Sequence, residues 1–68
     1  NPVKNQVLKI KGIDANQEHK FSLRDINGKL IWSKTMKTDI IPINLQSGLY
    51  FLSISNGNQQ FVKRIIVD

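Results

Sequence analysis

The 68-residue chain has no cysteine, a single histidine and no long run of apolar residues. Without cysteine, neither a disulfide nor a thiolate metal site can support the fold. His19 has only one adjacent carboxylate, that of Glu18, so the sequence contains no cluster of metal ligands. A membrane-spanning helix needs about 20 consecutive apolar residues, and no segment approaches that length. We therefore expect a domain that does not span a membrane and binds neither a metal nor a cofactor.

The residue types needed for catalysis are also scarce. A nucleophile needs a base beside it, and acid–base chemistry needs paired carboxylates or a metal. The four glycines are isolated, so no phosphate-binding loop is present. The acidic residues lie apart in turns, loops and the C-terminus, where such carboxylates usually bond to their own backbone; they are Asp14, Glu18, Asp25, Asp39 and Asp68. We predict that the chain is not an enzyme and has no catalytic residue.

Positive charge is in excess, with ten Lys and Arg against five Asp and Glu, a formal net charge of +5. This balance favours an anionic partner such as nucleic acid, lipopolysaccharide or an acidic protein face. However, the basic residues are scattered, as on solvated strand faces and protected edges. Phe21, Trp32 and Tyr50 fall at inward positions, and the RNA-recognition signature of aromatics interleaved with glycine and basic residues is missing. We therefore expect no binding of nucleic acid.

The chain does contain a succession of short strand patterns separated by turn signals. Residues 48–54 carry large apolar side chains on both faces of an extended chain, which predicts a strand inside a sheet, covered at least partly on both faces. Asn27-Gly28 predicts a hairpin with a two-residue type I′ turn, and Asn56-Gly57-Asn58 a second hairpin. Pro42 places its strand at an edge or bend. The other expected strands are residues 7–11, 20–26, 29–36, 40–43 and 60–67.

Six or seven short strands with turn signals at roughly every ten residues are typical of an all-β sandwich. With Greek-key connections, the predicted fold is an immunoglobulin-like β-sandwich. The facing of the last strand stays open, because Lys63 shares parity with Ile65 while Arg64 shares parity with Ile66. Either a bulge or a strand exposed on both faces at an edge would accommodate this pattern.

Several pieces of the sequence occur in an order and spacing that point to one family. They are Asn1-Pro2-Val3 followed by the Leu8-x-Ile10 strand, and residues 23–29, 45–54 and 61–67. Together they resemble the type A C-terminal sorting domain of the type IX secretion system, found on secreted and cell-surface proteins of Bacteroidetes bacteria. The resemblance covers essentially the whole chain.

This resemblance implies that residues 1–68 are a single domain of a longer secreted protein, with a cargo covalently linked on the N-terminal side. It implies an immunoglobulin-like fold that passes through the periplasm and is recognised there by the type IX outer-membrane translocon. A sortase-like cysteine protease usually then removes the domain. The cargo is attached to the cell surface or released outside the cell.

The resemblance also assigns residues. Lys63 and Arg64 are candidates for translocon recognition, because two adjacent cations among aliphatic residues leave one of them facing the apolar side of the strand. The other positions that match the family pattern have structural interpretations, mainly in turns and in the core; they are Asn1, Pro2, Asp25, Gly28, Gly48 and Tyr50.

An alternative from another class is an immunoglobulin-like accessory module that binds surface polysaccharide or packs against an enzyme domain. Such a module would need solvent-facing aromatic residues, and only Trp32 or Phe51 could serve. The sequence leaves open the cargo, the cleavage site, the face of the sandwich that is recognised, and whether the domain dimerises through an edge strand.

Overall fold

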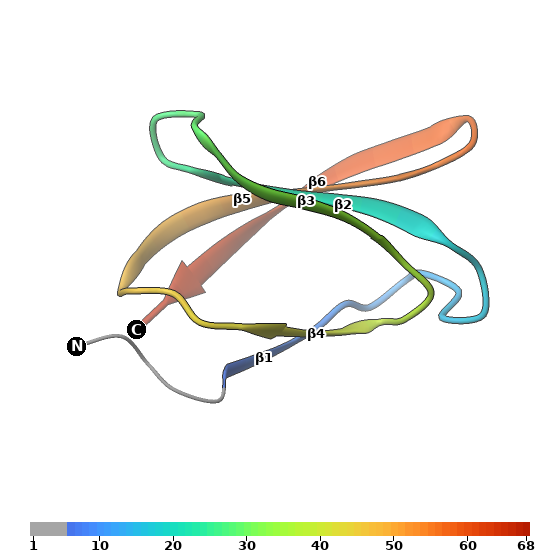
Figure 1. The fold of residues 1–68 in the computed structure, drawn as a ribbon, viewed down its shortest axis with the longest axis horizontal. Helices are drawn as coiled ribbons and strands as arrows, with labels where there is room; N and C mark the ends of the chain where they lie inside the picture. The colour runs from blue at the N-terminus through green and yellow to red at the C-terminus, as the bar shows by residue number, and fades with distance from the viewer. Residues whose placement is uncertain (1–5) are drawn as a thin grey trace.

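The computed structural model describes residues 6–68, which form six β-strands in two antiparallel sheets (Figure 1). The smaller sheet pairs β1 (Gln6–Lys9) with β4 (Ile40–Ile43). The larger sheet has the order β3 (Leu30–Met36), β2 (His19–Asp25), β5 (Gly48–Asn56) and β6 (Gln59–Val67). The described residues contain no helix that could span a membrane. The predicted all-β sandwich is confirmed.

The connections between the strands follow the Greek-key scheme of immunoglobulin-like domains. β2–β3 and β5–β6 are hairpins, while the chain crosses between the sheets before β2, before β4 and before β5 (Figure 1). β5 thereby returns to lie beside β2. The larger sheet matches the C′-C-F-G arrangement of such domains, and β1–β4 corresponds to their B–E pair. Asn1 and Pro2, which match the family pattern, lie outside the described residues.

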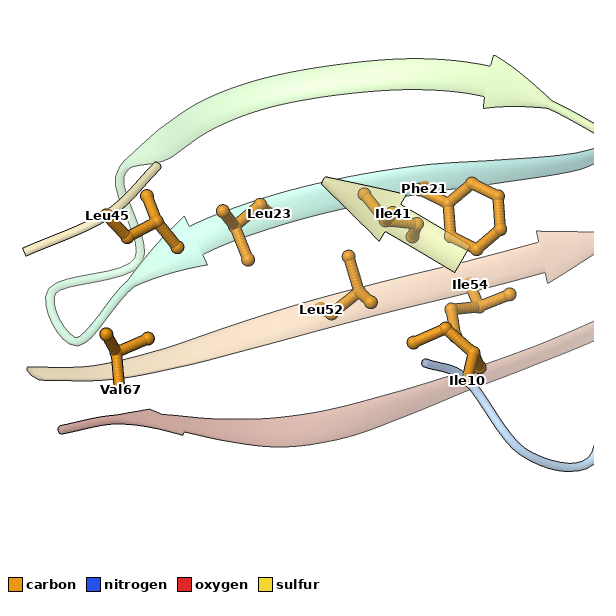
Figure 2. Packing of buried hydrophobic residues seen from close by; sticks show 8 residues of the cluster. All are labelled: Ile10, Phe21, Leu23, Ile41, Leu45, Leu52, Ile54 and Val67. Atoms are coloured by element: carbon orange, nitrogen blue, oxygen red, sulfur yellow. The ribbon is translucent and has the colours of Figure 1, made fainter. Parts of the chain in front are cut away.

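The core is the single apolar layer between the two sheets (Figure 2). Alternation along β2 and β5 turns every second side chain inward, so that Phe21, Leu23, Leu52 and Ile54 are at most 1% exposed. Each such burial contributes about 1.5–3 kcal/mol. The opposite side of the layer and its rim are closed by Ile10, Ile41, Leu45 and Val67.

β5 is an interior strand of the larger sheet, as predicted, since it pairs with β2 on one side and β6 on the other. Cover over both of its faces, at least in part, was also predicted, and the described side chains of β5 are covered on both faces, more completely on the inner face than on the outer face. Leu52 and Ile54 on the inner face are fully buried. Leu49 and Phe51 on the outer face are half-buried, and no element within residues 6–68 lies over the outer face of the larger sheet (Figure 1).

The β2–β3 hairpin exists, but its turn differs from the predicted two-residue type I′ turn. The Gly28 amide donates to the Asp25 carbonyl at 3.0 Å, so Ile26 and Asn27 occupy the centre of the β-turn. Gly28 follows with a φ of +83°, which completes a three-residue loop. The reason is Asp25, whose carboxylate accepts hydrogen bonds from the amides of Asn27 at 2.9 Å and Lys29 at 3.0 Å. Aspartate at the first turn position favours this geometry.

The start of β5 carries a tyrosine corner, a feature of immunoglobulin-like domains. The Tyr50 hydroxyl donates a hydrogen bond to the Gln46 carbonyl, four residues upstream, at 2.7 Å. Gly48 has a φ of +155°, which other residues rarely adopt, and a Cβ added there would lie 3.7 Å from the Tyr50 ring. The hydrogen bond and the glycine together hold the loop before β5 against the sheet.

Candidate functional site

The β5–β6 hairpin positions Lys63 and Arg64, the two residues predicted to be recognised. Its antiparallel register is unbroken from Gly48 opposite Val67 to Asn56 opposite Gln59. β6 therefore has no bulge, and its side chains alternate strictly between the two faces. In the described structure β6 lies at the end of the sheet order, where both of its faces are partly exposed. This position accommodates a cation on each face.

Lys63 faces the side of the sheet on which β1 and β4 lie, at the rim of the core. It pairs with Leu52, and its side chain is half-buried. The Lys63 ammonium lies 5.7 Å from the centroid of the Phe61 ring, which is on the same face of β6. Such a cation–π contact contributes about 0.5–1 kcal/mol at an exposed site. Lys63 thus has an intramolecular contact of its own.

Arg64 projects from the opposite, outer face and is exposed. The residue directly across from it on β5 is Phe51, and the residue across from Phe51 on β2 is Arg24. Side chains directly opposite in antiparallel strands have Cβ atoms about 4.5–5.5 Å apart. Arg24, Phe51 and Arg64 therefore form a row of neighbouring residues across the sheet, with Phe51 on the strand between the two arginines.

Apolar side chains surround this row. Leu49 pairs with Ile66 next to it, and Val62 lies on the same face of β6. Ile66 is 69% exposed and Val62 58%. We call this surface the arginine–aromatic face; it consists of Arg24, Leu49, Phe51, Val62, Arg64 and Ile66.

No acidic side chain belongs to this face. The only acidic residue in β2, β3, β5 and β6 is Asp25. Its carboxylate is hydrogen-bonded to two amides of the β2–β3 turn. The outer surface of the larger sheet therefore carries only positive formal charge on its strands.

The other end of the same outer surface is polar. Ser22 and Ser33 are joined by a hydrogen bond of 3.1 Å between their hydroxyl oxygens. Beyond them, Lys20 pairs with Ser55, which in turn pairs with Gln60. We call this region the serine end. One sheet surface thus has two chemically distinct halves.

Of the residues that match the family pattern, those in the described structure gather where the arginine–aromatic face begins. Asp25 is directly opposite Tyr50, Gly48 is opposite Val67, and Gly28 lies in the adjoining turn. Their hydrogen bonds and turn geometry stabilise the ends of β2 and β6 and the start of β5. They thereby stabilise the strand ends next to Arg24, Phe51 and Arg64.

Sequence reasoning missed this row. Counting outward from the Asn56-Gly57-Asn58 turn pairs Phe51 with Arg64, so this part of the row could have been predicted from the local sequence. The pairing of Arg24 with Phe51 had none, because it depends on β5 returning beside β2 after a long excursion through β4.

The end of the sandwich near the β5–β6 turn holds the buried polar residue His19, which is 5% exposed. Its Nδ1 lies 3.0 Å from the Gln17 carbonyl, and the Asn56 amide donates to the Gln17 side-chain oxygen at 2.9 Å. These groups line a hollow of about 230 Å³. Among residues 6–68, no group of three or more His, Cys, Asp or Glu could hold a metal ion.

The two aromatic residues that the accessory-module alternative requires are not equivalent. Trp32 packs against the core and has the Lys34 ammonium 5.0 Å from its ring centroid. Phe51 faces outward but lies between two arginines. Between Gln6 and Asp68, these two residues therefore provide no row of open aromatic rings on which a polysaccharide could stack.

Comparison with known proteins identifies the family. A family model described as the secretion system C-terminal sorting domain matches residues 1–68. Neither the curated proteins nor the solved structures contain a match. The match spans the whole chain and favours a sorting role over an accessory module. The chain therefore belongs to the secretion system C-terminal sorting domains and is a sorting signal for the type IX secretion system.

Proposed function

We propose that the domain is read by the outer-membrane translocon as a folded address, after the attached cargo protein has entered the periplasm. The cargo is linked on the N-terminal side and ends at the cell surface or outside the cell. A sortase-like cysteine protease removes the domain, so that the domain acts as a ligand and then as a substrate. The family match along residues 1–68 is the observation that supports this proposal.

Recognition of a folded domain is supported by what the family-pattern residues do. Asp25 bonds to the amides of its own turn, and Tyr50 forms the corner that holds the loop before β5. Gly28 and Gly48 adopt backbone conformations that other residues rarely adopt. A signal read as an extended segment would not need these contacts. Their role is to build a particular surface.

Lys63 and Arg64 are the proposed contact residues on β6. They face opposite sides of the sheet, so a single partner surface lying on the outer face reaches Arg64. Lys63, held beside Phe61, is reached from the rim of the sandwich. In this proposal Arg64 makes the main polar contact, and Lys63 adds a weaker one.

The proposal is tested by export of a reporter. The reporter carries an ordinary signal peptide at its N-terminus and residues 1–68 at its C-terminus, and it is expressed in a bacterium that has the type IX system. We expect the reporter at the cell surface or in the medium, with a mass that shows removal of the domain. The matched control is the same reporter with its signal peptide but without residues 1–68, and it should stay in the periplasm. Periplasmic retention of the full fusion would contradict the proposal.

A further inference from the structure

We propose that the arginine–aromatic face is the docking surface of the domain, and that its occupant is a folded protein whose carboxylates surround an apolar patch. This inference rests on the proposed recognition by the translocon and specifies the surface and the chemistry of the partner. It adds Arg24, Leu49, Phe51, Val62 and Ile66 to the recognised residues.

The first argument is exposure. Val62 and Ile66 are 58% and 69% exposed, and Phe51 is only half-buried. Ile66 is opposite Leu49, and Phe51, which is opposite Arg64, is the diagonal neighbour of both Val62 and Ile66. Contiguous apolar side chains on a small domain mark an interaction site more often than scattered ones do. Within residues 6–68 no element covers this surface (Figure 1).

The second argument is composition. Protein interfaces are enriched in aromatic residues and arginine at their centres, and these residues dominate the binding energy. Here Phe51 lies between Arg24 and Arg64 on adjacent strands. A guanidinium group binds a carboxylate through two parallel hydrogen bonds, which fixes the orientation of the partner as well as attracting it.

The third argument is charge, which separates the candidate occupants. The strands of this sheet surface present arginine and lysine but no outward acidic residue. A second copy of the domain docked face to face would bring like charges together, which is unfavourable. A highly charged glycan or lipid headgroup would leave the apolar side chains between the arginines in water. A partner with carboxylates around an apolar patch satisfies both parts of the surface.

The fourth argument is rigidity. The face is built on strands rather than on loops, and its near end is held by the Asp25 turn and the Tyr50 corner. A surface already fixed in its bound geometry loses little conformational entropy on binding. This accounts for the position of the family-pattern residues directly beside the face.

The test uses the reporter fusion with changes on the face. One variant carries Phe51→Ser, and another carries both Arg24→Glu and Arg64→Glu. We expect each to lower export by at least about tenfold, as for loss of a central interface anchor. Circular dichroism and thermal unfolding of the purified domains should show that the arginine variant keeps the wild-type fold, because neither arginine is part of the core.

The matched control changes the same amount of charge elsewhere. Lys20→Glu with Lys37→Glu alters the serine end and the loop after β3, and both residues are exposed. Export of this control should stay within about twofold of wild type, since exposed single charges contribute little. Wild-type export of the arginine variant, or an equal loss in the control, would overturn the docking face while the proposed sorting function stands. Retention of the unmodified fusion would contradict the sorting function itself.

The other occupants give distinct results with the purified domain. In analytical ultracentrifugation we expect a monomer; a dimer that Phe51→Ser dissociates would identify a second copy as the occupant and overturn the proposal. With vesicles that contain phosphatidylglycerol or lipopolysaccharide, we expect no co-sedimentation that depends on the arginines. Binding to these vesicles that is lost with Arg24→Glu and Arg64→Glu would likewise overturn it.

Discussion

The two faces of β5 differ in environment although they are similar in sequence. Leu52 and Ile54 on the inner face are completely buried beneath β1 and β4. Leu49 and Phe51 on the outer face have no described layer above them. Both pairs are large and apolar, so hydrophobicity alone does not distinguish core from interface. The difference lies in what the rest of the chain places over each face.

A second comparison lies within the outer surface itself. The serine end carries hydroxyl groups that bond to one another across β2 and β3. The arginine–aromatic face carries apolar groups and guanidinium groups, which find no acidic partner among the strands. Water hydrates the hydroxyl and guanidinium groups, but the apolar side chains around the arginines are exposed to water at a free-energy cost. This contrast is the physical basis for expecting a partner at one half only.

The largest expected effect is a core substitution on the inner face of β5. Leu52→Ala should lower the free energy of unfolding by about 2–5 kcal/mol, because it leaves a cavity where the side chain is fully buried. Leu49→Ala on the outer face should cost less than about 1 kcal/mol. Urea unfolding followed by circular dichroism measures both. Equal losses would mean that the outer face is as well covered as the core.

The next largest effect is expected in the β2–β3 turn. Asp25→Ala removes the acceptor of two backbone hydrogen bonds and should destabilise the domain by about 1–2 kcal/mol. Asp25→Asn keeps one side-chain oxygen and should cost less. Thermal unfolding of the two variants gives the ranking. If Asp25→Asn proved the more harmful of the two, the carboxylate would have a role beyond the turn.

The tyrosine corner should have a smaller effect. Tyr50→Phe keeps the ring against Gly48 but removes the hydrogen bond to the Gln46 carbonyl. We expect a loss of about 0.5–1.5 kcal/mol, the usual net contribution of one hydrogen bond. Urea unfolding provides the measurement. An unchanged midpoint would show that water replaces the hydroxyl without cost at this position.

The smallest effect on stability, with a large effect on export, is expected at Arg64. Arg64→Ala should change the free energy of unfolding by less than about 0.5 kcal/mol, because the side chain is exposed. Export of the reporter should nevertheless fall. Chemical unfolding and cell fractionation on the same variant separate the two quantities. If the loss of export were proportional to the loss of unfolding free energy in all of these variants, the outer face would have no role in export beyond its contribution to stability.

Much of the fold follows from local patterns. Period-two alternation identified the inward residues of β2 and β5, since that signal depends only on neighbours along the chain. Turn residues placed both hairpins, although the number of residues in the first turn came out wrong. Its length depends on the Asp25 carboxylate, which competes for the amides of the turn. The preference of Asn-Gly for a two-residue type I′ turn does not take these hydrogen bonds of the Asp25 carboxylate into account.

Local sequence patterns predict the strands and the core-facing residues of β2 and β5, and the resemblance to the family is also present in the sequence. The tertiary structure sets how β6 faces, because an edge strand with two partly exposed faces has no hydrophobic pattern to orient it. It also decided that Arg24, distant in sequence, lies across from Phe51 and in line with Arg64. Pairing between distant strands arises from closing long loops around a shared core, and no local segment encodes it.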